Sequence, residues 1–296
     1  MKAVCQMKVL CQMNTAGQMN TAWPMNKAAK VNKTAKTILI LLIFIFLILI
    51  FPGALPGRAG DEAIGEILDS LAKAERAFGP YSWYTDLVHY KNGKKLEGAR
   101  FLIVASKTNS LALYLSPPEN KGKIILQRGE SYYFFFPKAN NYIRISGGAR
   151  ALGNTSHGDL LRPPILDYYD MEKYEKAKNS KGEDIYVITF VQKETVANLP
   201  YYKKVVFFNP AQKEIEAIES YSRSGVKTGR VEHLASTAVA GVNFPVKSKI
   251  IDPNNDDNYT LQSNSEIRLI QLPGEFFTPG YLPSAEKYLR MRLGFK

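Results

Sequence analysis

Most of the chain between residues 81 and 270 consists of short apolar segments separated by turn signals. Within these segments the apolar side chains alternate, which is typical of strands, and Asn-Gly and Ser-Gly dipeptides at 92–93 and 224–225 are typical of hairpins. About a dozen such segments in succession favour one large antiparallel sheet or barrel. The predicted strands are 81–90, 99–106, 110–116, 123–127, 131–136, 141–146, 184–192, 202–208, 214–222, 226–234, 244–251 and 259–270.

A first helix is expected before these strands. Ile64, Leu68 and Leu71 belong to an apolar stripe with spacings of three and four residues. Asp61 can serve as the N-cap, and the Gly-Pro pair at 79–80 ends the helix near residue 78.

Two other segments interrupt the strand pattern. Residues 147–183 are irregular and rich in glycine and proline, with a short helical piece expected at 167–178. A connection of this length in a compact domain is expected to cover another part of the molecule. Residues 284–296 predict a short basic amphipathic helix, which we expect to be a solvated chain end; contact with anionic lipid is the alternative.

The segment SYYFFF at 131–136 carries aromatic residues at successive positions and therefore on both faces of its strand. We expect it to be covered on both sides, on one by a helix or loop. The second cover could be a ligand or the far wall of a barrel. An ordinary, well-packed central strand is the simpler interpretation.

The N-terminal region is typical of an exported protein. Residues 38–51 are uniformly apolar and follow a lysine-rich stretch at 27–36. Fourteen apolar residues are short for a spanning helix and suit the core of a secretory signal. We expect a signal peptide at 25–59 with cleavage near Ala59; an uncleaved membrane anchor is the alternative. Residues 1–24, with their repeated QMNTA, are interpreted as an extension upstream of the true start, and 60–296 as a single domain.

The charge and the cysteine content limit the partners and the cellular compartment expected for this protein. Seven of the 39 lysines and arginines and none of the 27 acidic residues lie in the first 60 positions, which leaves a net charge of only +5 beyond them. This weak excess argues against nucleic acid as a partner. Both cysteines, Cys5 and Cys11, precede the signal. An exported domain without disulfides favours a bacterial envelope.

No motif for catalysis or metal binding is found. His89, His157 and His233 are far apart, and neither HExxH nor G-x-S-x-G occurs. We expect His157 and Ser156 to be solvated loop residues. The sequence therefore predicts no enzyme, no catalytic residue, no metal and no cofactor.

Three stretches resemble the LolA-like outer-membrane lipoprotein-sorting proteins. They are PPENKGKIILQRGESYYFFFPKANNYIRIS at 117–146, GGARALGNTSHGDLL at 147–161, and the strand series at 202–252 with its partner at 266–282. The first is similar to the family's Pro-containing turn, aromatic Y-x-P-K hairpin and R-I strand. In the second, the acid and the aromatic of the family's Gly-Ser-Asp-Phe-type motif are missing.

The resemblance implies an incomplete antiparallel β-barrel of about 11–12 strands wrapped over helices. Its apolar cavity would bind the acyl chains of lipoproteins or lipids. An inner-membrane transporter and an outer-membrane acceptor are further candidate partners, and we expect a monomer in the periplasm of a diderm bacterium. The side chains expected to line this cavity are Leu111, Leu113, Leu115, Tyr133, Phe135, Ile143, Ile145, Ile64, Leu68 and Leu71.

The function expected on this basis is a periplasmic carrier that shields acyl chains during lipoprotein sorting to the outer membrane. The alternative is an envelope sensor or scaffold that uses the same fold to bind lipoprotein or a membrane transporter. An enzyme is the third hypothesis.

Overall fold

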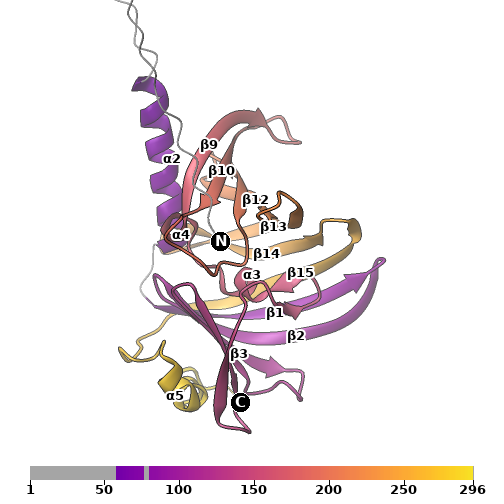
Figure 1. The fold of residues 1–296 in the computed structure, drawn as a ribbon, viewed down its shortest axis with the longest axis vertical. Helices are drawn as coiled ribbons and strands as arrows, with labels where there is room; N and C mark the ends of the chain where they lie inside the picture. The colour runs from indigo at the N-terminus through magenta and orange to yellow at the C-terminus, as the bar shows by residue number, and fades with distance from the viewer. Residues whose placement is uncertain (1–57, 77–79, 296) are drawn as a thin grey trace, which may run out of the picture. The chain divides into compact units, whose positions relative to one another are not determined.

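The computed structural model describes residues 58–76 and 80–295, and nearly all of its strands form one antiparallel sheet (Figure 1). In this part of the chain the sheet has 13 strands in the order β6-β5-β4-β3-β2-β1-β15-β14-β13-β12-β11-β10-β9, and its two edges, β6 and β9, remain open. The predicted mainly β fold, an incomplete antiparallel barrel, is confirmed, with 13 strands where 11–12 were expected. The strands are β1 (Tyr81–Lys91), β2 (Lys94–Ala105), β3 (Asn109–Ser116), β4 (Ile124–Arg128), β5 (Ser131–Phe136), β6 (Asn141–Ile145), β9 (Tyr169–Lys178), β10 (Asp184–Gln192), β11 (Lys203–Asn209), β12 (Glu214–Tyr221), β13 (Lys227–Val239), β14 (Val242–Asp252) and β15 (Asn255–Leu269).

The helices of the described residues are few. The predicted first helix is present but begins at Arg58, three residues before its expected N-cap. None of the described helices is long and apolar enough to cross a membrane. The predicted extension at 1–24, and all but the last two residues of the predicted signal peptide at 25–59, lie outside the described residues. The remaining elements are α2 (Arg58–Arg76), the ribbon β7 (Arg150–Leu152) and β8 (Thr155–Ser156), α3 (His157–Leu161), α4 (Ile165–Tyr168), the 3-10 helix η1 (Pro279–Tyr281) and α5 (Leu282–Leu293).

The helix predicted at 167–178 is wrong, because most of this segment is the edge strand β9. Its partly buried side chains Met171, Tyr174 and Ala177 are three residues apart, a spacing that imitates a helix. A shift of register between Thr189 and Phe190 of β10 interrupts the two-residue alternation of β9. The charged residues between these positions, typical of edge strands, reinforce the false helical pattern.

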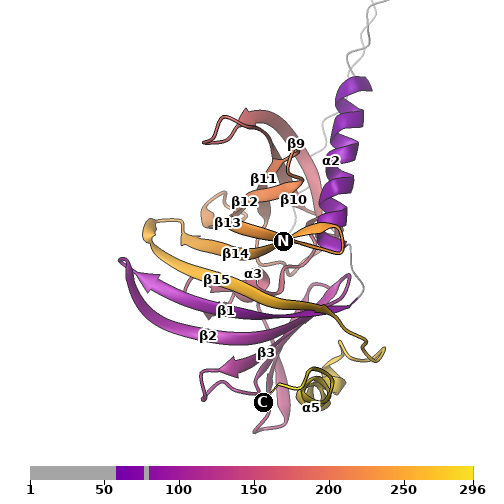
Figure 2. The same cartoon turned by 180° about the vertical axis from the view of Figure 1, so that it is seen from behind.

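The sheet has two faces with different covers. The inner face carries Trp83 and Phe101, and the outer face carries Leu102 and Leu113. α2 packs over the half of the inner face formed by β10 and β11, and α5 covers the outer face of β2–β5 (Figures 1 and 2). Both faces of the sheet therefore contribute to a hydrophobic core.

Residues 146–168, which we call the crossing segment, lead from edge strand β6 to the opposite edge strand β9. Leu160 and Leu161 of this segment pack on the inner face of β1–β5. Ile165 and Tyr168 pack with α2 on the inner face of β10 and β11. The long connection therefore covers the inner face, as its length suggested.

The aromatic strand β5 is covered on both sides by protein. Tyr132 and Phe134 pack in the inner core, whereas Tyr133 and Phe135 pack beneath α5 in the outer core. The prediction that this strand is covered on both faces is confirmed, and no ligand is needed as a cover.

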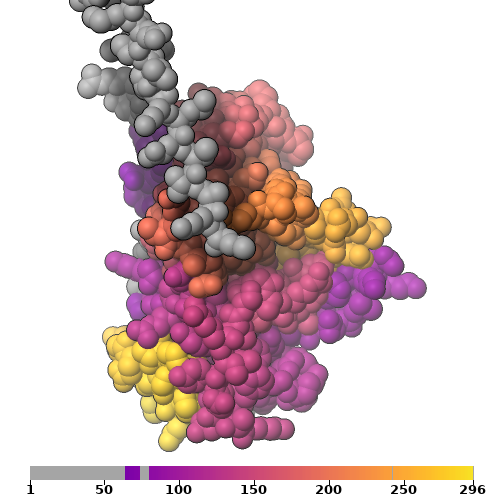
Figure 3. Space-filling model, viewed as in Figure 1, coloured from indigo at the N-terminus to yellow at the C-terminus, as the bar shows by residue number. Residues whose placement is uncertain are grey.

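The C-terminal helix is a packed element, so its expected role as a solvated chain end is wrong. Leu282, Ala285 and Leu289 of α5 have no exposed surface and contact the outer face of the sheet together with Phe276. Figure 3 shows the yellow C-terminal segment against the magenta part of the chain that holds β3–β6. Lys287 and Arg292 of this helix are exposed, whereas Arg290 is half-buried and pairs with Glu286.

Replacing Leu289 by alanine is expected to lower the free energy of unfolding by about 2–5 kcal/mol, because the side chain is fully buried and leaves a cavity. Met291 on the same helix is 73% exposed, so Met291→Ala should change it by less than about 0.5 kcal/mol. Denaturant unfolding of both variants checks this. Equal losses would show that α5 does not pack on the sheet.

The crossing segment depends on a glycine where it passes over the aromatic strand. A Cβ atom at Gly147 would lie 2.6 Å from the Tyr132 ring, whereas at the neighbouring Gly148 the nearest atom is 3.6 Å away. Gly147→Ala is therefore expected to lower the free energy of unfolding by about 1–3 kcal/mol, with Gly148→Ala close to neutral. Thermal unfolding of the two variants tests this, and a stable Gly147→Ala protein would contradict it.

Candidate ligand-binding site

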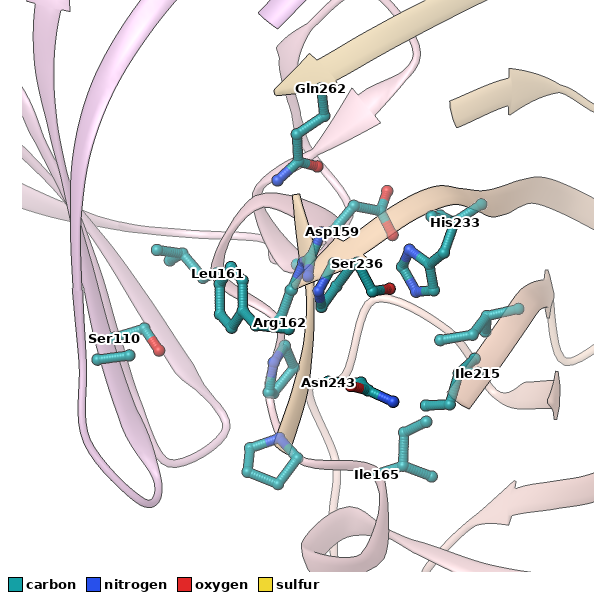
Figure 4. Close-up of a pocket in the computed structure, with 18 of the residues that line it drawn as sticks. Ser110, Asp159, Leu161, Arg162, Ile165, Ile215, His233, Ser236, Asn243 and Gln262 are labelled. Carbon is teal, nitrogen blue, oxygen red and sulfur yellow. The ribbon is translucent and has the colours of Figure 1, made fainter. Parts of the chain in front are cut away.

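A cavity of about 150 Å³ lies between the inner face of the sheet and the crossing segment (Figure 4). Strands β12–β14 form one wall, and the end of α3 with the following prolines, Pro163 and Pro164, forms another. This volume is at least about ten times the minimum of ~10–15 Å³ that admits one water-sized group.

The register of the strands gives this wall an apolar row and a polar row. Ile218 of β12 pairs with Val231 of β13, which pairs with Ile250 of β14, and all three line the cavity. Two residues further along β13, His233 pairs with Ser248, and its Nδ1 lies 2.9 Å from the Ser248 hydroxyl. The wall is therefore amphipathic.

Arg162 brings a cationic group to the cavity from the C-terminal end of α3. Its backbone has φ 49°, in the left-handed region, and its N–H donates to the carbonyl of Gly158 at 2.9 Å. The Nη2 atom of its guanidinium is buried, and no atom of the described residues accepts a hydrogen bond from it. Burial lowers the pKa of the Arg162 guanidinium, because removal from water disfavours its charged form.

A second donor in the cavity lacks an acceptor. Trp83, which lines the inner wall, is only 3% exposed, and its indole Nε1 has no hydrogen-bond partner among residues 58–76 and 80–295. Buried donors are nearly always satisfied in folded proteins. Two unsatisfied donors lining one cavity point to a ligand that accepts hydrogen bonds.

A hydrogen-bond network fixes α3 beside the cavity. The Oδ2 atom of Asp159 accepts from the hydroxyls of Ser156 and Tyr201, each at 2.7 Å, and from the backbone N–H of Ser156 at 3.1 Å. Ser156 in turn caps the helix by accepting from the N–H of Asp159. The expectation that Ser156 and His157 are solvated loop residues is wrong, because both are 5% exposed at the buried start of α3.

The remaining charges around the cavity come from β11 and from the turn into β12. Lys204 is buried, with its Nζ 5.6 Å and 5.7 Å from the ring centroids of Tyr169 and Tyr201. Lys213 is exposed, and burial raises the pKa of the Glu214 carboxyl. With Arg162 and Asp159 included, three cationic side chains face two acidic ones.

Five of the ten side chains predicted to line a cavity lie beneath α5 on the outer face of the sheet. Leu111 and Leu113 are fully buried there, with Leu115, Tyr133 and Phe135 beside them. They do not line the inner cavity; Leu111, Leu113 and Phe135 are buried beneath α5, whereas Leu115 and Tyr133 are partly exposed.

The other five side chains belong to the inner face but not to the cavity wall. Ile64 and Leu71 of α2 are buried near α4, with Leu68 packed against them. Ile145 of β6 packs in the inner core, whereas Ile143 is 49% exposed. Tyr133 pairs with Arg144 and not with an isoleucine. The predicted aromatic residues of β5 and the predicted isoleucines of β6 therefore lie on opposite faces of the sheet. The predicted set therefore does not form one surface.

The residues that build the cavity were missed, because each has an ordinary sequence context. Arg162 follows two leucines in an irregular stretch, and His233 is one of three scattered histidines. The Arg-Pro-Pro sequence at 162–164 was the one local signal. Among the described residues, no group of three or more potential ligands could hold a metal ion.

The fold is similar to that of several solved structures. A LolA superfamily protein from Nitrosomonas europaea superposes with a TM-score of 0.65 at 20% identity, over 73% of this chain and 98% of the other. A DUF1329 family protein from Desulfovibrio piger gives 0.61 at 15% identity, over 74% and 98%. A domain from Vibrio parahaemolyticus described as an outer membrane lipoprotein-sorting protein gives 0.60 at 16% identity, over 74% and 97%. The predicted LolA resemblance is thus confirmed at the level of fold.

A family model also matches the sequence of this chain. A family model described as "Uncharacterized protein" matches residues 106–284, more than half of the chain. No curated protein sequence matches the chain.

The burial of His233 makes the stability of the fold depend on pH. Removal of its ring from water and the nearby Arg162 lower its pKa to about 3, from 6.5. Because the unfolded chain then binds a proton that the folded chain does not, stability is full above pH 6.5 and falls as the pH drops toward 3. The loss should approach about 1.4 kcal/mol for each pH unit in that range.

His233→Gln should remove this part of the pH dependence of unfolding, while the wild-type imidazole should show no NMR titration between pH 8 and about 4. A wild-type imidazole that titrates near pH 6.5 would show that the ring is hydrated and contradict the prediction.

Proposed function

This chain belongs to the uncharacterized-protein family matched over residues 106–284 and has the fold of the LolA superfamily, and from this premise we propose that it is a carrier of acyl chains. The observation that carries the proposal is the amphipathic cavity on the inner face of the sheet. The name of the Vibrio parahaemolyticus domain links the same fold to the sorting of outer-membrane lipoproteins.

The apolar row supplies the binding energy for such a ligand. Each methylene that moves from water to the surface of Ile218, Val231 and Ile250 contributes about 0.8 kcal/mol before the costs of association. Binding of this kind requires no catalytic group. In the arrangement described, the cavity holds one short acyl chain, and a lipoprotein with several chains requires the crossing segment or α5 to move.

The predicted acyl-chain contacts at Leu111, Leu113, Leu115, Tyr133 and Phe135 fit the same proposal as a second surface. In the described structure α5 occupies this surface. We propose that it accepts acyl chains only when α5 is displaced.

We place the carrier in the periplasm of a diderm bacterium. This rests on the basic and apolar run at 27–51 and on the absence of cysteine after residue 11. Lipoprotein acyl chains are the ligands that this location and fold favour, with a membrane transporter and an outer-membrane acceptor as protein partners.

Native mass spectrometry before and after mild organic extraction tests the carrier function. The wild-type protein should carry an extractable lipid mass, and Val231→Trp should abolish it because the indole fills the cavity. Val226→Trp is the matched control, since Val226 is 62% exposed on the turn before β13 and should leave the lipid mass unchanged.

An unliganded mass that also refuses added decanoate would contradict the carrier function. A stable protein complex that survives extraction would then favour the sensor or scaffold alternative.

A further inference from the structure

The cavity lining holds a polar cluster beside the apolar row of β12–β14. In Figure 4, Arg162, Asp159, His233 and Ser236 lie near one another, and Ile165 and Ile215 lie below them with Asn243 in between. The side chains of the cluster come from the crossing segment and from β13, so both walls of the cavity contribute to it.

Two donors of the cavity lining have no acceptor. Arg162 Nη2, in the polar cluster, and Trp83 Nε1, from β1, are buried and unpaired within the described part of the chain. The Asp159 carboxylate is close enough to influence Arg162 electrostatically, but no ion pair within 4.0 Å joins the two, and the acid already accepts three hydrogen bonds at Oδ2. Arg162 therefore retains hydrogen-bonding capacity toward the cavity.

Leaving a guanidinium in this state is unfavourable for the ligand-free protein. A buried cation without a hydrogen-bonded anion carries a desolvation cost that an incoming anion offsets. Guanidinium is well suited to carboxylate and phosphate oxygens, which accept two parallel hydrogen bonds. The indole N–H adds a third donor of the kind that such oxygens accept.

We propose that this cavity binds a single-chain amphiphile with an anionic head, a carboxylate or phosphate held by Arg162 and Trp83, with its chain on the apolar row of β12–β14. The inference deepens the proposed function, on which its acyl part rests, by naming the class of ligand. The size of the cavity fits a medium-length chain such as that of decanoate.

Isothermal titration calorimetry on the full-length protein after lipid extraction tests the head group. The probes are decanoate, decyl phosphate, uncharged decanol and inorganic phosphate. Decanoate and decyl phosphate should bind at least about tenfold more tightly than decanol, the factor expected for hydrogen bonds to a charged group. The ratio of decanoate to decyl phosphate identifies which anion the site prefers.

Arg162→Met should weaken decanoate binding at least about tenfold and leave decanol within about twofold, because only the anionic head loses its partner. Trp83→Phe removes the N–H and keeps most of the ring, so it should weaken decanoate severalfold. Arg223→Met is the matched control, since Arg223 is exposed and stacks on Tyr202 away from the cavity. The ligand-free Arg162→Met protein should melt at the same temperature as wild type or higher.

The outcomes separate the two proposals. Equal affinity for decanol and decanoate, or an unchanged decanoate affinity in Arg162→Met, would overturn the anion site and leave the carrier function standing. Inorganic phosphate binding as tightly as decyl phosphate would keep the anion site and overturn the acyl-chain function. Binding of none of the four probes would overturn both. If Arg162→Met does not fold, Trp83→Phe and Arg162→Lys decide in its place.

Discussion

The structure depends on how the chain returns from one open edge of the sheet to the other. Strands β1–β6 extend the sheet in one direction and β9–β15 fill it from the opposite edge, so the connection has to span the sheet. It passes over the inner face, and where it is buried, at residues 155–158, its polar backbone must find partners within the protein. The capping box of α3 satisfies the N–H groups of Ser156 and Asp159, and the N–H groups of His157 and Gly158 donate to the carbonyls of Ala149 and Gly147 at 2.9 Å and 2.8 Å.

The cavity is a consequence of the same constraint. A connection made of two short helices and two prolines cannot fill an inner face as a long amphipathic helix does. α2 supplies such a helix over β10 and β11, and Leu160 and Leu161 fill the space over β1–β5. Between these two cores the wall of β12–β14 keeps free space, and this is where the unpaired donors lie.

The sequence predicted the strands well because alternation is a local property. It failed at β9, where a shift of register turned a strand into a helix-like spacing. It could not assign faces, because in β3 and β5 both sets of alternating side chains are apolar and both are buried. One residue of register decides the face, and that register is set by turns and by neighbouring strands. The cover over Leu111 and Leu113 comes from α5, which is far along the chain, and its amphipathic pattern did not show which surface it packs on.

The spacing of apolar and polar residues along β13 restricts which ligands fit the cavity. Along β13, the apolar position Val231 and the polar position His233 are two residues apart, which is about 7 Å in an extended strand. A ligand that meets both rows must therefore carry its anionic group within a few bonds of its first methylenes. A carboxylate attached directly to a chain meets this condition. The register that brings Ile218, Val231 and Ile250 side by side thus selects the shape of the amphiphile, and Arg162 selects its charge.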